Sequence, residues 1–271
     1  MQSAVTICLV PEARQGPFVF HDGLEAGCRA AAELGFDGVE IFPDSAAGFE
    51  GSGVAGCLAA SGLALAAVGS GAGWVKHKLH LCHPDPTVRA EAVSFVGELV
   101  DRAGDLGAPV IIGSMQGRSE GDVTREQALA LLADALDALG ARAARHGQVV
   151  LYEPLNRYES NLFNRQADAV EFLGAHRIAN VKLLCDLFHM NIEEADMAGV
   201  IEACGSAVGH VHWADSNRQA IGCGHTAVGP IVDALRRIGY HGFLSAEVFP
   251  APTSLAAARQ SIESFRTFTK G

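Results

Sequence analysis

Four residues with metal-binding side chains recur at similar intervals in the second half of the chain. They are Glu153, Asp186, His212 and Glu247. Three carboxylates and one imidazole gathered in an apolar scaffold are costly unless a cation compensates their charge. An oxygen-rich donor set with one histidine suits Mn²⁺, Mg²⁺ or Co²⁺ better than a zinc site built from thiolates. The pattern therefore predicts one divalent metal ion, with Mn²⁺ preferred and Zn²⁺ left open.

Each of these residues also has an ordinary structural interpretation. Asp186 suits a helix N-cap, Glu247 a charge at the molecular rim and His212 a buried histidine with a satisfied hydrogen bond. We favour a shared site because all four stand at the same place, the end of a predicted strand, in four successive units of the chain.

Short strand-like runs alternate with longer helical segments along the whole sequence. The strands are expected at residues 5–10, 38–42, 63–68, 109–112, 148–153, 181–186, 207–213 and 242–248. The helices are expected at residues 22–34, 50–61, 85–106, 124–144, 166–175, 194–203, 229–238 and 252–268. Eight such units predict an α/β fold, a single (β/α)8 TIM barrel formed by residues 1–271 as one domain.

An open, doubly wound sheet would show the same alternation of strands and helices. That fold usually carries a glycine-rich phosphate-binding turn after its first strand. Residues 11–17, Pro-Glu-Ala-Arg-Gln-Gly-Pro, contain no such motif. The closed barrel is therefore the better prediction, and in a barrel polar residues at the carboxyl ends of the strands meet at one mouth.

Composition narrows the possible partners. The formal net charge of −11 disfavours binding to nucleic acid or to an anionic membrane, and no run of Lys and Arg offsets it. The first residues do not resemble a signal peptide, and no apolar run approaches the roughly 18 residues of a membrane span. We expect a cytoplasmic protein that acts on a small molecule.

Several runs resemble sugar-phosphate isomerase/epimerase barrels of the xylose-isomerase-like group, most closely the ketose 3-epimerases of the tagatose, psicose and ribulose types. These runs are LYEPLNRYE at 151–159, DLFHMNIEE at 186–194, GHVH at 209–212 and the Gly-Tyr-His-Gly turn at 239–242. The resemblance implies that Glu153, Asp186, His212 and Glu247 bind one divalent metal ion, and that Glu153 and Glu247 are the catalytic acid/base pair. It further implies substrate binding by Glu159, His189 and Arg218, a sugar or polyol substrate, and a homo-oligomer, either a dimer or a tetramer.

Proton transfer at a carbon next to a carbonyl is the chemistry that this set of residues suits. One carboxylate removes the proton, the metal stabilises the enediolate, and the second carboxylate returns a proton to the opposite face. Epimerisation of a ketose is the preferred activity. A keto-inositol dehydratase or an aldose–ketose isomerase of the hydroxypyruvate type would use the same metal site, and a non-catalytic barrel would lack a stoichiometric ion.

The N-terminal half departs from the ketose epimerases in two loops, at residues 69–78 and 113–118. These loops shape the substrate pocket in such barrels, so they bear on substrate choice. We expect Trp74 to form an apolar wall, and Lys76, Lys78 and Arg118 to contact an anionic substrate. The alternative is a mobile glycine-rich loop with solvated cations.

Overall fold

Eight parallel strands close into a barrel, and their order around it follows their order in the chain. The computed structural model describes residues 1–269. The strands are β1 (Gln2–Cys8), β2 (Gly38–Phe42), β3 (Ala64–Gly69), β4 (Val110–Ile112), β5 (Val150–Tyr152), β6 (Val181–Asp186), β7 (Val208–His212) and β8 (Phe243–Ala246). The predicted TIM barrel is confirmed, and β8 pairs with β1 to close it.

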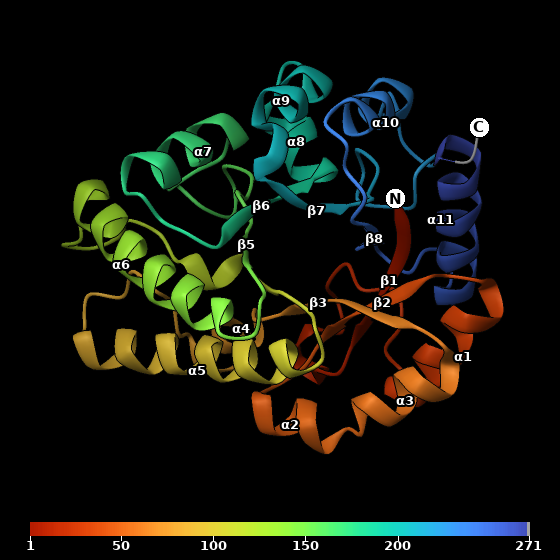
Figure 1. The fold of residues 1–271 in the computed structure, drawn as a ribbon, viewed down its shortest axis with the longest axis horizontal. Helices are drawn as coiled ribbons and strands as arrows, with labels where there is room; N and C mark the ends of the chain where they lie inside the picture. Colours follow the sequence, from red (N-terminus) through yellow and green to blue (C-terminus); the bar gives the residue numbers. More distant parts are fainter. Residues whose placement is uncertain (270–271) are drawn as a thin grey trace.

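Helices surround the barrel on its outer side (Figure 1). They are α1 (Leu24–Leu34), α2 (Ala46–Gly51), α3 (Val54–Ser61), α4 (Ala72–His77), α5 (Pro86–Asp105), α6 (Arg125–Ala144), α7 (Gln166–Ala175), α8 (Leu187–Glu193), α9 (Met197–Cys204), α10 (Val228–Arg237) and α11 (Ser254–Thr269). Three short 3₁₀ turns join them, at Pro11–Ala13, Ser114–Gln116 and Gly205–Ala207. None of the helices described combines the length and the apolar composition needed to cross a bilayer.

Capping residues explain where the two longest helices begin. The side chain of Asp85 accepts a hydrogen bond from the amide of Thr87 at 2.7 Å, and Pro86 occupies the first helical position, where its missing N–H costs nothing. Thr124 and Gln127 form the expected reciprocal capping box at the start of α6. Both helices therefore begin where the sequence predicts.

The structure differs from the predicted elements in a few places. The first strand covers Gln2–Cys8 rather than residues 5–10, because Gln2 to Val5 pair with β8 as the barrel closes. The predicted helix at 50–61 is two helices, α2 and α3, divided by Gly53, whose positive φ of 70° cannot continue a helix. The prediction of one domain includes residues 270–271, which lie outside the described residues, and it stays a prediction.

Alternation along the strands separates two apolar layers. Val110 and Ile112 belong to the large core between the barrel and the helices, whereas Ile111 between them belongs to a small cluster with Ala67, Leu151 and Leu184. Successive side chains of a strand point to opposite faces, so this small cluster lies inside the barrel. It occupies the part of the interior next to β3, β4, β5 and β6.

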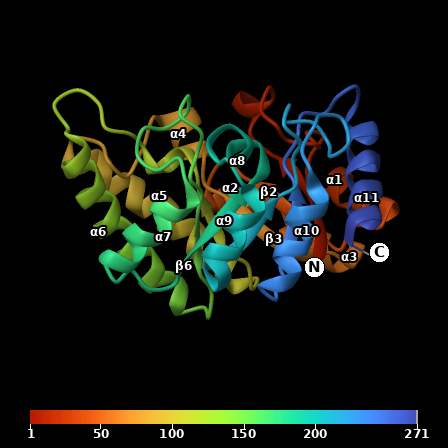
Figure 2. The same cartoon turned by 90° about the horizontal axis from the view of Figure 1, so that it is seen from above.

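The strands run from the end of the barrel where the N-terminus lies towards the opposite end, where the loops are longer (Figure 2). The short helices α4 and α8 lie at that end, directly after β3 and β6. Side chains at the carboxyl ends of the strands therefore face the mouth of the barrel beneath these loops.

Two glycine-to-alanine substitutions offer a matched test of the packing of the outer helices. A Cβ at Gly140 in α6 would lie 2.4 Å from the carbonyl oxygen of Ala179, whereas nothing lies within 4 Å of a Cβ at Gly174 in α7. We expect Gly140→Ala to lower the free energy of unfolding by about 1–3 kcal/mol through overpacking. Gly174→Ala should raise it by about 0.5–1 kcal/mol, because alanine favours the helix. Urea denaturation measures both, and equal effects would contradict the packing described.

Candidate active site

Strand alternation brings the four predicted ligands together at the barrel mouth. The residue before each ligand, namely Tyr152, Cys185, Val211 or Ala246, lies in the outer core against the helices. Each ligand therefore points the other way, into the barrel. Ligand atoms of Glu153, Asp186, His212 and Glu247 all lie within 4.8 Å of one another, which is close enough to hold one ion.

The His212 ring lies at the centre of this group. Its Nδ1 atom is 3.0 Å from Asp186 Oδ2, 3.3 Å from Glu247 Oε2 and 3.5 Å from Glu153 Oε1. Asp186 and His212 are buried, and Glu153 is 5% exposed. Asp186 is also the N-cap of α8, since its Oδ1 accepts hydrogen bonds from the amides of Phe188 and His189. The N-cap interpretation of Asp186 is confirmed, and the other carboxylate oxygen stays directed at His212, where the predicted metal site would use it.

Glu40 in β2 is a buried residue that the sequence analysis missed. Its carboxylate lies 3.2 Å from His212 Nε2 and 2.9 Å from His210 Nε2. β2 and β7 are not neighbours in the barrel, so these contacts cross its interior. A proton on His212 Nε2 that is shared with Glu40 leaves the Nδ1 lone pair facing the three carboxylates, as a metal ligand requires. A charged residue within the apolar run GVEIF is the signal that could have revealed it.

The electrostatics of the cluster follow from its burial. The pKa of Glu153 is raised to about 7, mainly by burial and also by the neighbouring carboxylates of Glu247 and Asp186, against the lowering effect of His212. Burial also disfavours the charge of Asp186, but Arg218, His189 and His212 together outweigh this effect and lower the pKa of that carboxyl. Burial lowers the pKa of His212, but the surrounding carboxylates, Glu247 and Glu40 foremost, outweigh it and raise that pKa well above its usual value. Four buried carboxylates, counting that of Glu40, thus surround the His212 ring and the Arg218 guanidinium, so negative groups are in excess.

A hydrogen bond to its backbone holds Glu153 in place, and Gly113 leaves space for its carboxylate. Gln116 Nε2 donates to the carbonyl oxygens of Gly113 and Glu153, each at 3.0 Å, and so ties the end of β4 to the end of β5. A Cβ at Gly113 would lie 2.5 Å from Glu153 Oε2, so a larger residue would displace the carboxylate. Glu153 Oε1 is buried and has no hydrogen-bond partner among the described residues.

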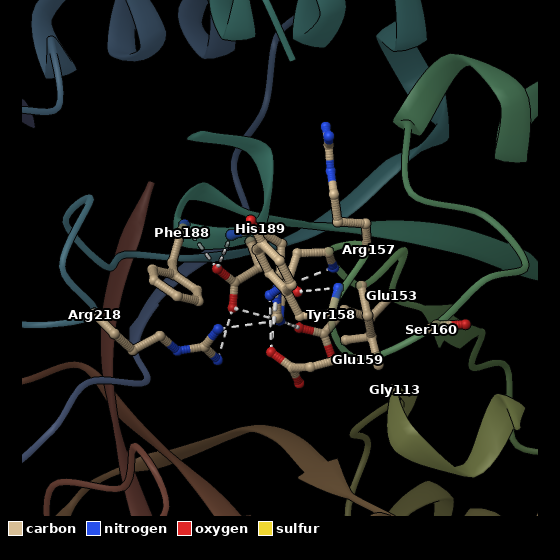
Figure 3. A network of polar contacts seen from close by, with 12 residues as sticks. Gly113, Glu153, Arg157, Tyr158, Glu159, Ser160, Phe188, His189 and Arg218 are labelled. Carbon is tan, nitrogen blue, oxygen red and sulfur yellow. Dashed lines mark hydrogen bonds and ion pairs between the residues drawn. The ribbon is translucent and has the colours of Figure 1, made fainter. Parts of the chain in front are cut away.

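The three predicted substrate-binding residues surround this cluster (Figure 3). Arg218 is 6% exposed and extends towards it, with Nη1 at 3.0 Å from His189 Nε2, Nη2 at 3.0 Å from Asp186 Oδ2, and a contact with Glu247. Burial lowers the pKa of His189, so this ring is neutral at pH 7. Glu159 accepts a hydrogen bond from Asn156 Nδ2 at 2.8 Å and lies 3.8 Å from His189 Nδ1. The structure therefore brings Glu159, His189 and Arg218 to one place.

Asp215 organises the loop that carries Arg218. Its carboxylate accepts hydrogen bonds from the backbone amides of Ser216, Gly222, Gly224 and Thr226. Burial raises the pKa of this carboxyl, but the four hydrogen bonds outweigh burial and lower the pKa to about 2. The amide of Arg218 donates to the Asp215 carbonyl at 2.8 Å. The segment from Gly222 to Gly224 therefore forms a turn around the Asp215 carboxylate.

A cavity of about 270 Å³ opens above the cluster, and we call it the mouth cavity. Glu153, Glu159, His189, Arg218 and Glu247 line it, together with residues of both unassigned loops, among them Gly69, Ser70, Val75, Gly113 and Ser114. The loops at 69–78 and 113–118 therefore do contribute to its walls.

Two of the loop cations have partners within the protein. Lys76 pairs with Asp44 at 3.4 Å, and the Lys78 ammonium lies 5.1 Å from the centre of the Trp74 ring. Neither lysine lines the mouth cavity, and neither does Arg118. Their predicted contact with an anionic substrate is therefore not supported at this cavity.

Comparisons with known proteins agree with this geometry. The chain is 32% identical over 178 residues to the D-psicose 3-epimerase of Ruminiclostridium cellulolyticum, an alignment that covers 63% of this chain and 59% of that enzyme. It therefore spans less than two thirds of that relative's length. It is 30% identical over 231 residues to the ketose 3-epimerase of Arthrobacter globiformis, which covers 84% of this chain and 78% of that enzyme.

The fold has well-matched solved counterparts. The 3-keto-D-glucoside 4-epimerase of Escherichia coli superposes with a TM-score of 0.82 over 98% of this chain and 100% of that one, at 23% identity. At this identity the likeness concerns the fold alone. The family model described as "Xylose isomerase-like TIM barrel" matches residues 28–268, most of the sequence. The chain therefore belongs to the xylose isomerase-like TIM barrel family.

Proposed function

We propose that the protein is a divalent-metal-dependent epimerase of a ketose or related sugar, which inverts a carbon next to the carbonyl by two-base proton transfer. The observation that carries the proposal is the convergence of the Glu153, Asp186, His212 and Glu247 ligand atoms within 4.8 Å beneath a cavity. Relatives named as ketose 3-epimerases support the same substrate class.

The residues present fit a divalent cation. Glu153 Oε1 forms no hydrogen bond with a described residue, and carboxylates are in excess at this buried site. Both features are costly, and a cation held by the four side chains would compensate both. The donor set favours Mn²⁺, with Mg²⁺ or Co²⁺ as alternatives. When bound, the ion would supply positive charge that stabilises the enediolate oxygens of the reacting sugar.

Glu153 and Glu247 are the proposed acid/base pair. They follow β5 and β8, which are separated by two strands around the barrel, and both line the mouth cavity. A sugar carbon held between them presents one face to each carboxylate. Glu153 removes or returns the proton on one face and Glu247 acts on the other, and exchange of roles converts each epimer into the other.

The other side chains bind and orient the substrate. Arg218 offers a planar fork of donors to sugar oxygens, and its guanidinium lies 4.9 Å from the centre of the Phe188 ring, which restricts its position. His189 and Glu159 add a neutral ring and a hydrogen-bond acceptor next to Arg218. A dimeric or tetrameric state and a cytoplasmic location stay predictions.

Metal affinity tests the proposed centre without any assay of activity. We expect one Mn²⁺ per chain, measured by calorimetry on the metal-stripped protein. Glu40→Gln should weaken binding by about 10–100-fold, because the partner that orients His212 loses its charge. Glu40→Asp should restore part of the affinity, and Glu33→Gln on exposed α1 should leave it unchanged. A wild-type chain that binds no stoichiometric ion would overturn the proposed centre.

Single-base variants test the two-base assignment. With Mn²⁺ saturating, Glu153→Gln and Glu247→Gln should each slow epimerisation by at least about 10²-fold, as loss of a positioned acid/base group does. In deuterated water each variant should still exchange the proton of one epimer through its remaining carboxylate, and the two variants should prefer opposite epimers.

NMR of D-fructose and D-psicose measures exchange and product together. Glu171→Gln, on the exposed surface of α7, is the control. If either base variant kept near-normal epimerisation, the assignment would be wrong. Formation of an aldose would indicate an aldose–ketose isomerase instead of an epimerase. Loss of water from a keto-inositol would indicate a dehydratase.

A further inference from the structure

A second cavity adjoins the mouth cavity, and we call it the rim cavity. Its volume is about 240 Å³, and it shares Ser114, Leu155 and Glu159 with the mouth cavity as common walls. Its remaining walls include Trp74, His80, Arg118 and Glu120. Trp74 and Arg118 come from the two loops whose sequence does not match the ketose epimerases.

The volumes suggest one ligand with two parts. Small-molecule sites usually measure about 300–1,000 Å³, and each cavity alone falls below that range. Together they fall within it. Because Glu159 and Ser114 stand between the two spaces, a molecule seated over Glu153 and Glu247 could continue past them into the rim cavity.

The rim cavity is lined by two side chains with polar atoms that form no hydrogen bond to any residue the structure describes. The half-buried Arg118 makes no hydrogen bond or ion pair with any residue the structure describes, although a guanidinium carries five donors. His80 is 2% exposed, and its Nδ1 atom is buried without a hydrogen-bond partner among those residues. A guanidinium on a cavity wall that pairs with no described residue can donate to the oxygen atoms of a ligand, so a ligand that pairs with Arg118 is favoured.

The charges around the cavity favour a neutral, hydroxyl-bearing ligand over an anion. Arg118 is its one lining cation and faces the carboxylates of Glu120 and Glu159 on the same walls. Burial lowers the pKa of His80, so that ring adds no positive charge at pH 7. Hydroxyl groups donate to carboxylates and accept from a guanidinium, and the Trp74 indole gives an apolar face for the C–H groups of a sugar ring.

We propose that the substrate is a two-unit sugar, in which a neutral hydroxylated ring occupies the rim cavity while the keto unit it is attached to lies in the mouth cavity. This inference rests on the proposed function, because it assumes that the reacting unit lies between Glu153 and Glu247. Arg118 and Trp74 are then specificity-determining residues.

Substrate preference tests the inference. The Mn²⁺-loaded protein is given D-fructose and D-psicose, and beside them glycosylated ketoses and keto-glycosides of different linkage, with proton exchange in deuterated water as the readout. We expect the best two-unit sugar to exceed the best monosaccharide in kcat/KM by at least about tenfold, mainly through KM. Arg118→Met keeps the length of the side chain and should lower that preference about tenfold or more, as loss of a charged hydrogen bond does.

Controls separate the two proposals. Arg29→Ala, which removes an exposed guanidinium on α1, should leave the preference unchanged. Ligand-observed NMR then measures binding of the same sugars to wild type and to Arg118→Met without turnover. Equal or better use of monosaccharides, or a preference that Arg118→Met does not change, would overturn the inference. Absence of exchange with every sugar would overturn the proposed function, and binding that depends on Arg118 would still support the rim cavity.

Discussion

Mutual repulsion among three carboxylates at the barrel mouth is the constraint on which the arrangement of the site depends. Glu153, Asp186 and Glu247 converge on His212 where water is largely excluded, and a low dielectric strengthens every interaction between charges. The pKa of Glu153 is raised by its burial and by the neighbouring carboxylates, and Arg218 approaches Asp186 and offsets part of the same negative charge. A bound divalent cation would offset more of it, and it would release Arg218 to contact substrate.

Much of the surrounding structure keeps these groups in place. Glu40 reaches across the barrel interior to hold His212, while Gln116 fixes the backbone of Glu153 and Asp215 shapes the loop of Arg218. The contacts of Glu40 and Gln116 join segments that are distant in sequence, whereas Asp215 organises its own loop. Partners of this kind fix the tautomer and direction of a ligand, which a flexible side chain alone would not maintain.

The two proposals place substrate choice and chemistry in different parts of the molecule. The ligand cluster comes from strands β5 to β8, whereas Trp74 and Arg118 come from loops after β3 and β4. Loops can change in length and composition with little effect on the barrel, so one set of metal ligands can serve different sugars. The rim cavity is where this chain departs from the ketose epimerase pattern.

Local patterns in the sequence were sufficient for the eight strand–helix units, for the helix starts at Asp85 and Thr124, and for the four strand-end ligands, because alternation and capping act between near neighbours. Only the tertiary structure shows that Glu40 contacts His210 and His212 and that Lys76 pairs with Asp44. It also shows that Arg118 pairs with none of the residues described. The register of β1 also depended on its pairing with β8. Those features arise because barrel closure brings together residues that are more than a hundred positions apart or on separate loops. Local periodicity in the sequence does not predict such contacts.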